Sequence, residues 1–365
     1  MSSALAHVAW EPCFAEERHD RELEAYARRR MGLPNPAVRY FAAAPWVARV
    51  AVDTHPDLGL LIHLDLRTAD LVGLVVSQEN SCRFCFAAVR AVLWFLGMDR
   101  QRVLRVEQEL ARTDLPERLR ATLDYARAQS RSGPAGAHGA WTALRAAGVS
   151  AAEAREIAFT VSVTDFSNRL HTALAIPPVP FERTPESFVM RLLRPLIERA
   201  IGSRRHHGNP VPAMLQSPEL PYARLIAAFG DSPIAPALAR ALNDMLASPH
   251  LSRRCKLLMF AVVSRGLPCE VCEVELTRVL QREGLDAATV NRLLTHLDGP
   301  ELVAVERRLM SYARETLWYQ PAALQRQTRE LREHLSTEQL VEAVGVAALA
   351  NGICRMAAVV MDEPA

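Results

Sequence analysis

The feature of this sequence that most constrains its fold is the repetition of a whole segment 187 residues further along the chain. Residues 63–127 align with residues 250–314 without a gap, and about 20 of these 65 positions are identical. A spacing of 187 residues is far longer than the roughly 20–50 residues of a solenoid repeat. The sequence therefore predicts an internal duplication of a domain. Identical pairs include His63/His250, Leu71/Leu258, Cys82/Cys269, Cys85/Cys272 and Gly97/Gly284.

Each copy contains a Cys-x-x-Cys pair at the same place in the repeat. In the first copy an apolar run and a polar turn precede Cys82 and Cys85, and a new apolar segment then runs to Gly97. The second copy follows the same plan around Cys269 and Cys272. The pattern predicts a helix, a tight turn with a dithiol, and a second helix that ends at a glycine.

Composition favours helices over sheets. Alanine, the strongest helix former, is abundant, and aromatic residues make up only 6% of the chain. Half of the residues are hydrophobic, which is ample for a large buried core. We therefore predict an all-α fold in which two similar helical domains follow each other along the chain.

The predicted organisation has four parts. Residues 1–35 form a charged N-terminal helical arm, and residues 36–178 form the first domain. Residues 179–209 are a proline-rich linker with a short helix, and residues 210–365 form the second domain.

Charge and cysteine usage narrow the class of protein. The net charge of +2 gives no electrostatic case for binding nucleic acid or an anionic membrane surface. We see no run of about 18 apolar residues that predicts a transmembrane helix, and the N-terminus turns polar too early for a signal peptide. Seven cysteines, four of them in two pairs, suit a reducing compartment. We therefore expect a cytoplasmic protein with neither a nucleic-acid nor a membrane partner.

Two stretches carry a resemblance to a known family. They read LVVSQENSCRFCFAAVRAVLWFLGM in the first copy and, more weakly, FAVVSRGLPCEVCEVELTRVLQREGL in the second. Each half resembles the carboxymuconolactone decarboxylase superfamily, in particular its alkylhydroperoxidase D-like (AhpD-like) branch. The resemblance implies two tandem AhpD-like domains with thiol-disulfide oxidoreductase activity, including weak peroxidase activity. It also implies a peroxide or disulfide substrate, a thiol or lipoyl protein as reductant, no cofactor, and a dimer or trimer of this chain.

The family motif assigns roles to residues of the first copy. It has eleven residues between a Glu and Cys-x-x-Cys, and three residues between Cys-x-x-Cys and a His. By resemblance, Cys85 attacks peroxide, Cys82 resolves the product as a disulfide, and Asp70 occupies the acidic position of the proton relay. The His position holds Val89, so strong peroxidase activity is not expected.

The second copy keeps the dithiol of Cys269 and Cys272 but holds leucine at both relay positions. Three glutamates surround this pair, and their negative charge should raise the pKa of both thiols. The first-copy pair opens a helix, whose N-terminus stabilises a thiolate. We therefore expect the first dithiol to react faster, with Cys82 as the more exposed thiol and Cys85 as its partner.

Other interpretations of these residues remain open. The dithiols are vestigial if the chain is a non-catalytic helical scaffold or a small-molecule-binding protein. A zinc site is disfavoured, because the two pairs are 184 residues apart whereas those of a zinc ribbon lie roughly 15–20 apart. The decarboxylase branch of the same superfamily uses no dithiol. Outside the motif, His63 is expected to be buried and hydrogen-bonded, and for His171 packing is favoured over a place in a pocket.

Overall fold

The computed structural model is helical, and the residues it describes contain no strand. The prediction of an all-α fold is therefore confirmed. Apart from Pro195, the predicted linker of residues 179–209 lies outside the described residues, as does the predicted helix end at Gly97. The described residues are 5, 8–31, 35–95, 115–178, 195 and 221–361.

The helices of the first half surround one long helix, α9, which spans Ala151–Ala173. The others are α1 (Arg21–Met31), α2 (Val38–Phe41), α3 (Pro45–Asp53), the 3₁₀ turn η1 (Pro56–Leu58), α4 (Leu66–Glu79), α5 (Arg83–Phe95), α7 (Glu117–Arg131) and α8 (Pro134–Ala146).

The helices of the second half surround a second long helix, α18, which spans Thr337–Val360. Four of its helices, α13, α14, α16 and α17, begin 187 residues after α4, α5, α7 and α8, the same spacing as the sequence repeat. The helices of this half are α11 (Ala223–Ala228), α12 (Ile234–Ala247), α13 (Arg253–Gly266), α14 (Glu270–Arg282), α15 (Ala287–His296), α16 (Ala304–Glu315), the 3₁₀ turn η4 (Thr316–Trp318) and α17 (Pro321–Arg332).

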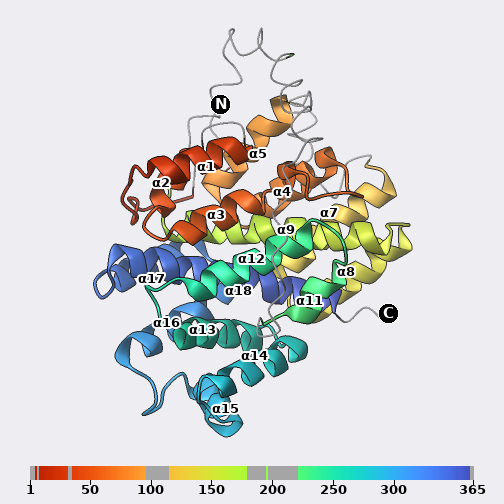
Figure 1. The fold of residues 1–365 in the computed structure, drawn as a ribbon. Helices are drawn as coiled ribbons and strands as arrows, with labels where there is room; N and C mark the ends of the chain where they lie inside the picture. The colour runs from red at the N-terminus through yellow and green to blue at the C-terminus, as the bar shows by residue number, and fades with distance from the viewer. Residues whose placement is uncertain are drawn as a thin grey trace.

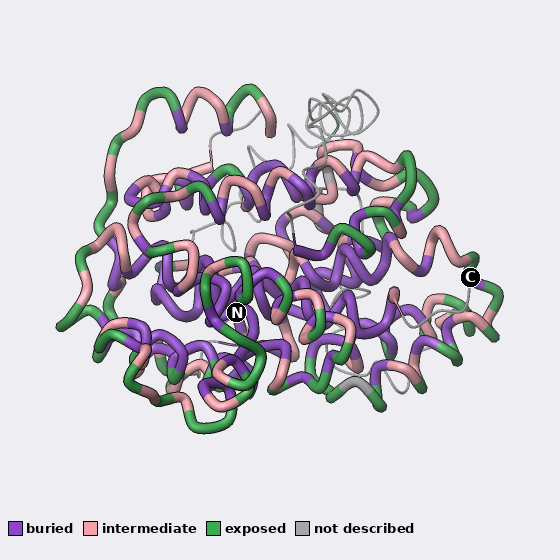
Figure 2. Tube along the Cα trace, turned by 60° about the horizontal axis from the view of Figure 1, so that its bottom comes forward, coloured by how far each residue is buried: buried purple, intermediate pink, exposed green. Residues whose placement is uncertain are grey.

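The two long helices lie side by side across the middle of the molecule (Figure 1). Among the described helices, α9 and α18 share the most extensive contact. Both are buried along most of their length, as the tube in Figure 2 shows for the centre of the molecule. Buried side chains from both halves belong to one continuous hydrophobic cluster.

Short polar side chains fix where these helices begin. The hydroxyl of Ser150 accepts a hydrogen bond from the backbone N–H of Glu153, which caps α9 as the sequence predicts. The hydroxyl of Ser336 caps α18 through the N–H of Gln339. Such caps satisfy N–H groups that have no partner in the first turn of a helix.

Three details of the predicted helices are wrong. Within the described part of the arm only Arg21–Met31 is helical. The apolar pattern predicts a helix from Leu58 to Val76, but α4 begins only at Leu66. The carboxylate of Glu156 accepts hydrogen bonds from three N–H groups of residues 62–64 and holds them in a loop. The stretch Gly133-Pro134-Ala135-Gly136 predicts a loop, but it is helical from Pro134, since proline needs no hydrogen-bond acceptor in the first turn.

Helix α18 is long and apolar enough, by composition, to cross a membrane. Charged residues interrupt its sequence, so it does not contain the unbroken run of about 18 apolar residues that predicts a transmembrane helix. In the structure 94% of its most apolar window is buried inside the fold, which is typical of a core helix.

Helices α9 and α18 approach closely at Gly352. A Cβ atom on Gly352 would lie 2.8 Å from the backbone carbonyl oxygen of Ser162. We expect Gly352→Ala to destabilise the protein by up to about 2 kcal/mol, because the overpacking cost of about 1–3 kcal/mol is offset by a gain of only about 1 kcal/mol in helix propensity. Urea unfolding followed by circular dichroism measures the change.

Gly73 in α4 provides the matched control. A Cβ there would meet Val89 at an ordinary distance of 3.6 Å, so Gly73→Ala should stabilise by about 0.5–1 kcal/mol. Equal stability of the two variants would show that the helices do not approach closely at Gly352.

Candidate active site: a buried dithiol

The first dithiol lies at the start of α5. The N–H of Cys82 donates to the carbonyl of Ser77 at the end of α4, and the carbonyl of Cys82 accepts from the N–H of Phe86. Cys82 therefore stands at the N-cap of α5, where the unpaired N–H groups of the helix are found. Both thiols are free, and they are nearly buried: Cys82 is 0% exposed and Cys85 is 8% exposed.

The prediction that Cys82 is the more exposed thiol is wrong. The pKa of Cys82 is nevertheless lowered, as expected for a thiol at a helix N-terminus. Burial alone would raise the pKa of Cys82, but hydrogen bonds from the Cys85 thiol and N–H, from the Thr172 hydroxyl and from the Phe84 N–H outweigh burial and lower it. Burial and the neighbouring Cys82 raise the pKa of Cys85 well above that of an ordinary thiol. The pair therefore favours a Cys82 thiolate that accepts a hydrogen bond from a Cys85 thiol.

A histidine that the sequence analysis assigned to packing lies beside the dithiol. The Nδ1 atom of His171, on α9, is 3.7 Å from the Cys85 sulfur and 2.6 Å from the carbonyl oxygen of Ser167. The imidazole stacks on Phe84, with ring centroids 4.0 Å apart. Because a carbonyl oxygen only accepts, Nδ1 carries the proton and donates it to Ser167.

The other nitrogen of this ring is free to accept. Burial lowers the pKa of His171 to about 4, so the imidazole is neutral near pH 7. Its Nε2 atom is buried and has no hydrogen-bond partner among the described residues. His171 can therefore offer a neutral acceptor close to the dithiol, although it is not placed to take the proton of Cys85 through Nδ1.

The two relay positions of the family motif lie on α4 and α5. Val89 packs against α4 beside Gly73. Asp70 is half-buried on α4. Glu79, the last residue of α4 before the turn that leads to Cys82, is about 14 Å further along the helix axis. His171 on α9 lies beside the Cys85 sulfur, and the next residue, Thr172, bonds to Tyr319, which follows η4 in the second half of the chain.

An N-terminal segment, residues 8–14, lies over the start of α5 and the end of α9; we call it the N-terminal strap. The indole N–H of Trp10 donates to the carbonyl of Ile176, and the N–H of Phe14 donates to the carbonyl of Leu174. The guanidinium of Arg83, inside the Cys-x-x-Cys motif, donates to the carbonyl of Val8 and lies 6.0 Å from the Trp10 ring. Through these contacts the N-terminal strap covers the part of the molecule next to the dithiol.

The second pair differs from the first in state and surroundings. Cys269 and Cys272 are joined by a disulfide and are buried. At the repeat spacing, the residues that correspond to His171 and Thr172 are Ala358 and Val359, which are buried and apolar. The second pair therefore lacks the polar groups that α9 brings to the first.

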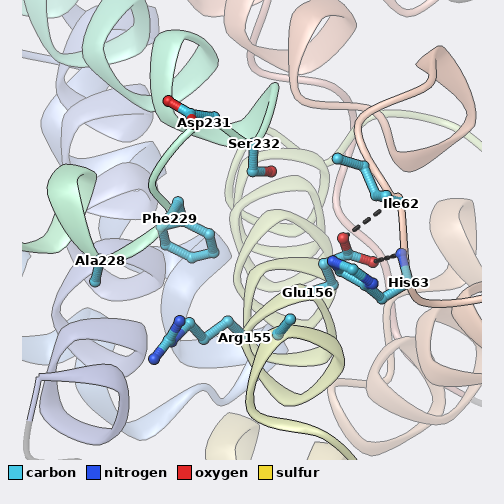
Figure 3. A pocket seen from close by; sticks show the side chains of 9 residues that line it. Ile62, His63, Arg155, Glu156, Ala228, Phe229, Asp231 and Ser232 are labelled. Carbon is cyan, nitrogen blue, oxygen red and sulfur yellow. Dashed lines mark hydrogen bonds between the residues drawn. The ribbon is translucent and has the colours of Figure 1, made fainter. Parts of the chain in front are cut away.

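A pocket lies at the opposite end of α9 from the dithiol. It has a volume of about 290 Å³ and is lined by residues of the 62–63 loop, the start of α9 and the turn between α11 and α12 (Figure 3). Glu156 in its wall is about 22 Å along the helix axis from His171, so this pocket does not serve the dithiol. His63 lines it and is exposed, which contradicts the expected burial of that side chain.

No cluster of three or more metal-ligating side chains is found in the part of the chain that the structure describes. Comparisons of the chain with protein-family models, curated proteins and solved structures found no match in any of the three. A functional proposal for this protein therefore rests on the geometry of its own residues.

Proposed function

We propose that the chain is an AhpD-like thiol-disulfide oxidoreductase in which Cys82 and Cys85 cycle between a dithiol and a disulfide. The observation that carries the proposal is the polarised pair at the N-terminus of α5. The two free thiols lie together at this helix N-terminus, and the polar groups around Cys82 lower its pKa despite its burial, which favours a thiolate. Thiolates are the reactive form in thiol-disulfide exchange.

The proposed reaction with a hydroperoxide has two steps. Cys85, the thiol nearer to solvent, takes one oxygen atom, so that its thiol and R–O–O–H become a sulfenic acid and R–O–H. As the Cys85 sulfur attacks, its proton passes to the neighbouring Cys82 thiolate, and solvent water supplies the proton that completes R–O–H. Cys82 then attacks the sulfenic acid, which forms the disulfide and releases water. An external dithiol, small or protein-bound, donates the two electrons that restore the pair.

The internal duplication forms part of the same proposal. The helix starts recur at the spacing of the sequence repeat, which supports two copies of one ancestral unit. The first copy would hold the reactive dithiol, and the second would contribute Tyr319 and a pair without polar neighbours. Thiol counting tests the redox proposal: mild peroxide should consume two thiols per chain, and Cys82→Ser/Cys85→Ser should abolish that loss.

The N-terminal strap gives a prediction about access to the dithiol. Trp10→Ala removes one hydrogen bond and one cation–π contact, worth together about 1.5 kcal/mol, so local opening should become about tenfold more populated. We expect iodoacetamide to alkylate Cys82 and Cys85 about tenfold faster, as measured by peptide mass spectrometry. Ile62 lies near the start of α9, at the end remote from the dithiol, and its side chain is 61% exposed. The control substitution Ile62→Ala should leave both alkylation rates unchanged. Unchanged rates in Trp10→Ala would mean that the strap does not control access.

A second candidate function is small-molecule binding without catalysis, and the pocket in Figure 3 favours it. The pocket combines apolar walls with the imidazole of His63 and the charged side chains of Arg155 and Asp231. If peroxide leaves the Cys82 and Cys85 thiols intact, this second function becomes the better account.

A further inference from the structure

Each half of the fold holds one buried glutamate at an equivalent place. Glu156 on α9 and Glu342 on α18 each lie six residues after the serine that caps the helix, and they are 2% and 0% exposed. Glu156 accepts a hydrogen bond from the N–H of Leu64. Glu342 accepts one from the N–H of Leu251, which corresponds to Leu64 at the repeat spacing. The two carboxylates therefore have the same place in the two copies.

Side chains complete the surroundings of Glu342. The ammonium of Lys256 lies 3.2 Å from its carboxylate, and the indole N–H of Trp46 donates to it at 3.3 Å. Trp46 belongs to α3 of the first half, and its ring packs on α18 at Gly345, where a Cβ atom would lie 3.2 Å from it. A buried carboxylate is costly unless it is paired and hydrogen-bonded, and here a cation and an aromatic N–H meet that need.

The surroundings of Glu156 differ in both respects. At the repeat spacing Lys256 corresponds to Ala69, which carries no charge. The turn between α11 and α12 faces the start of α9, and the first turn of α12 contains no aromatic residue. Within the described residues Glu156 forms no ion pair, and its hydrogen-bond donors are the N–H groups of residues 62–64. The described part of the chain therefore supplies neither a cation nor an aromatic N–H to this buried charge.

The space beside Glu156 is the pocket of about 290 Å³ described above. Figure 3 shows Phe229 on one side of the pocket and Glu156 on the other. The Arg155 side chain reaches away from the Glu156 carboxylate in the same view. Ligand pockets measure roughly 300–1,000 Å³, so this volume suits a molecule with one or two fused rings.

We propose that this pocket binds an arylalkylamine, a small organic cation with a planar aromatic ring. The ring would lie against Phe229, in the role that Trp46 has beside Glu342, and an N–H of the ligand would donate to Glu156. The ligand would thus bring the positive charge that the described surroundings of Glu156 lack. The inference goes beyond the redox function and does not depend on it, and it gives the second candidate function a ligand class.

Titration calorimetry of the full-length protein with tryptamine tests the proposal. We expect one binding site per chain, and binding at least about tenfold weaker for indole-3-acetate, which has the same ring but a negative charge. Equal or tighter binding of indole-3-acetate would show that the pocket prefers anions and would overturn the assigned ligand class. Absence of binding by both compounds would overturn the site itself. Oxidation of Cys82 and Cys85 by peroxide is measured separately and bears on the redox function alone.

Three variants assign the binding to Glu156. A hydrogen bond to a charged group predicts that Glu156→Gln weakens tryptamine binding about 10- to 100-fold. Asp231, an exposed carboxylate of the same pocket, is the matched control, and Asp231→Asn should weaken binding by less than about fivefold. Ala152→Trp should abolish binding, because it fills the pocket and removes no hydrogen bond of Glu156.

Circular dichroism confirms that each variant is folded before it is titrated. If Glu156→Gln does not fold, Ala152→Trp decides, since its indole lies at the pocket and leaves the 62–64 loop anchored. Unchanged tryptamine binding in Ala152→Trp would place the ligand elsewhere on the protein. A loss in Asp231→Asn as large as that in Glu156→Gln would show that the exposed carboxylate, rather than the buried one, selects the cation.

Discussion

Asp165→Ala is expected to destabilise the protein by about 3–5 kcal/mol, the largest stability effect among the substitutions considered. The Asp165 carboxylate is buried on α9, where it accepts hydrogen bonds from Asn80 and Ser130 at 2.7 and 2.8 Å. It also pairs with Arg169 at 3.0 Å and lies 3.9 Å from Arg355 on α18. Removing the carboxylate would leave two buried guanidinium groups with no opposing charge, and this is why the cost is large.

An exposed ion pair gives the control for this substitution. Asp298 is 70% exposed and lies 3.3 Å from Arg307, so Asp298→Ala should change stability by less than about 1 kcal/mol. Urea unfolding of the two variants and the native protein measures both effects. A loss below 1 kcal/mol in Asp165→Ala would mean that water or rearranged side chains compensate the two arginines.

The variant Cys82→Ser/Cys85→Ser is expected to lose turnover of an organic hydroperoxide by at least about 100-fold, because serine can neither accept the peroxide oxygen nor form a disulfide. The assay follows consumption of the hydroperoxide with dithiothreitol as the electron donor. The rate should depend on protein concentration for the native chain and fall to the uncatalysed rate for the variant.

The second dithiol provides the matched control, because it has the same spacing at the start of α14. Cys269→Ser/Cys272→Ser should retain most of the turnover, since the polar neighbours of the first pair are replaced there by Ala358 and Val359. Turnover that disappears with the second pair and survives loss of the first would reverse the assignment of the reactive dithiol.

Much of the fold could be predicted from the sequence, because its signals are local. Helix caps such as Ser150 and the abundance of alanine act within a few residues, and they indicate helices whatever surrounds them. The error at Leu58 has a tertiary cause. The apolar pattern there is helical, but the Glu156 carboxylate, 92 or more residues away in sequence, binds the loop that precedes α4.

The candidate site could be predicted only in part, for the same reason. The spacing of Cys82 and Cys85 is visible in the sequence, as is their place at a helix start. His171 lies 86 residues from Cys85 in sequence, and Tyr319 lies 147 residues from Thr172. Neither has a spacing that marks it, and Tyr319 corresponds to Ser132 at the repeat spacing, so the repeat gives no signal either. Only the packing of α9 against its neighbours brings these groups to the dithiol.

Disulfide mapping by mass spectrometry tests the central claim most directly. The reduced protein is treated with a small excess of hydrogen peroxide, its remaining thiols are blocked, and the peptides are analysed before and after reduction by dithiothreitol. The redox account predicts rapid formation of a Cys82–Cys85 disulfide that dithiothreitol reverses. If both thiols remain reduced while Cys13 or Cys354 is oxidised, Cys82 and Cys85 do not form a redox centre.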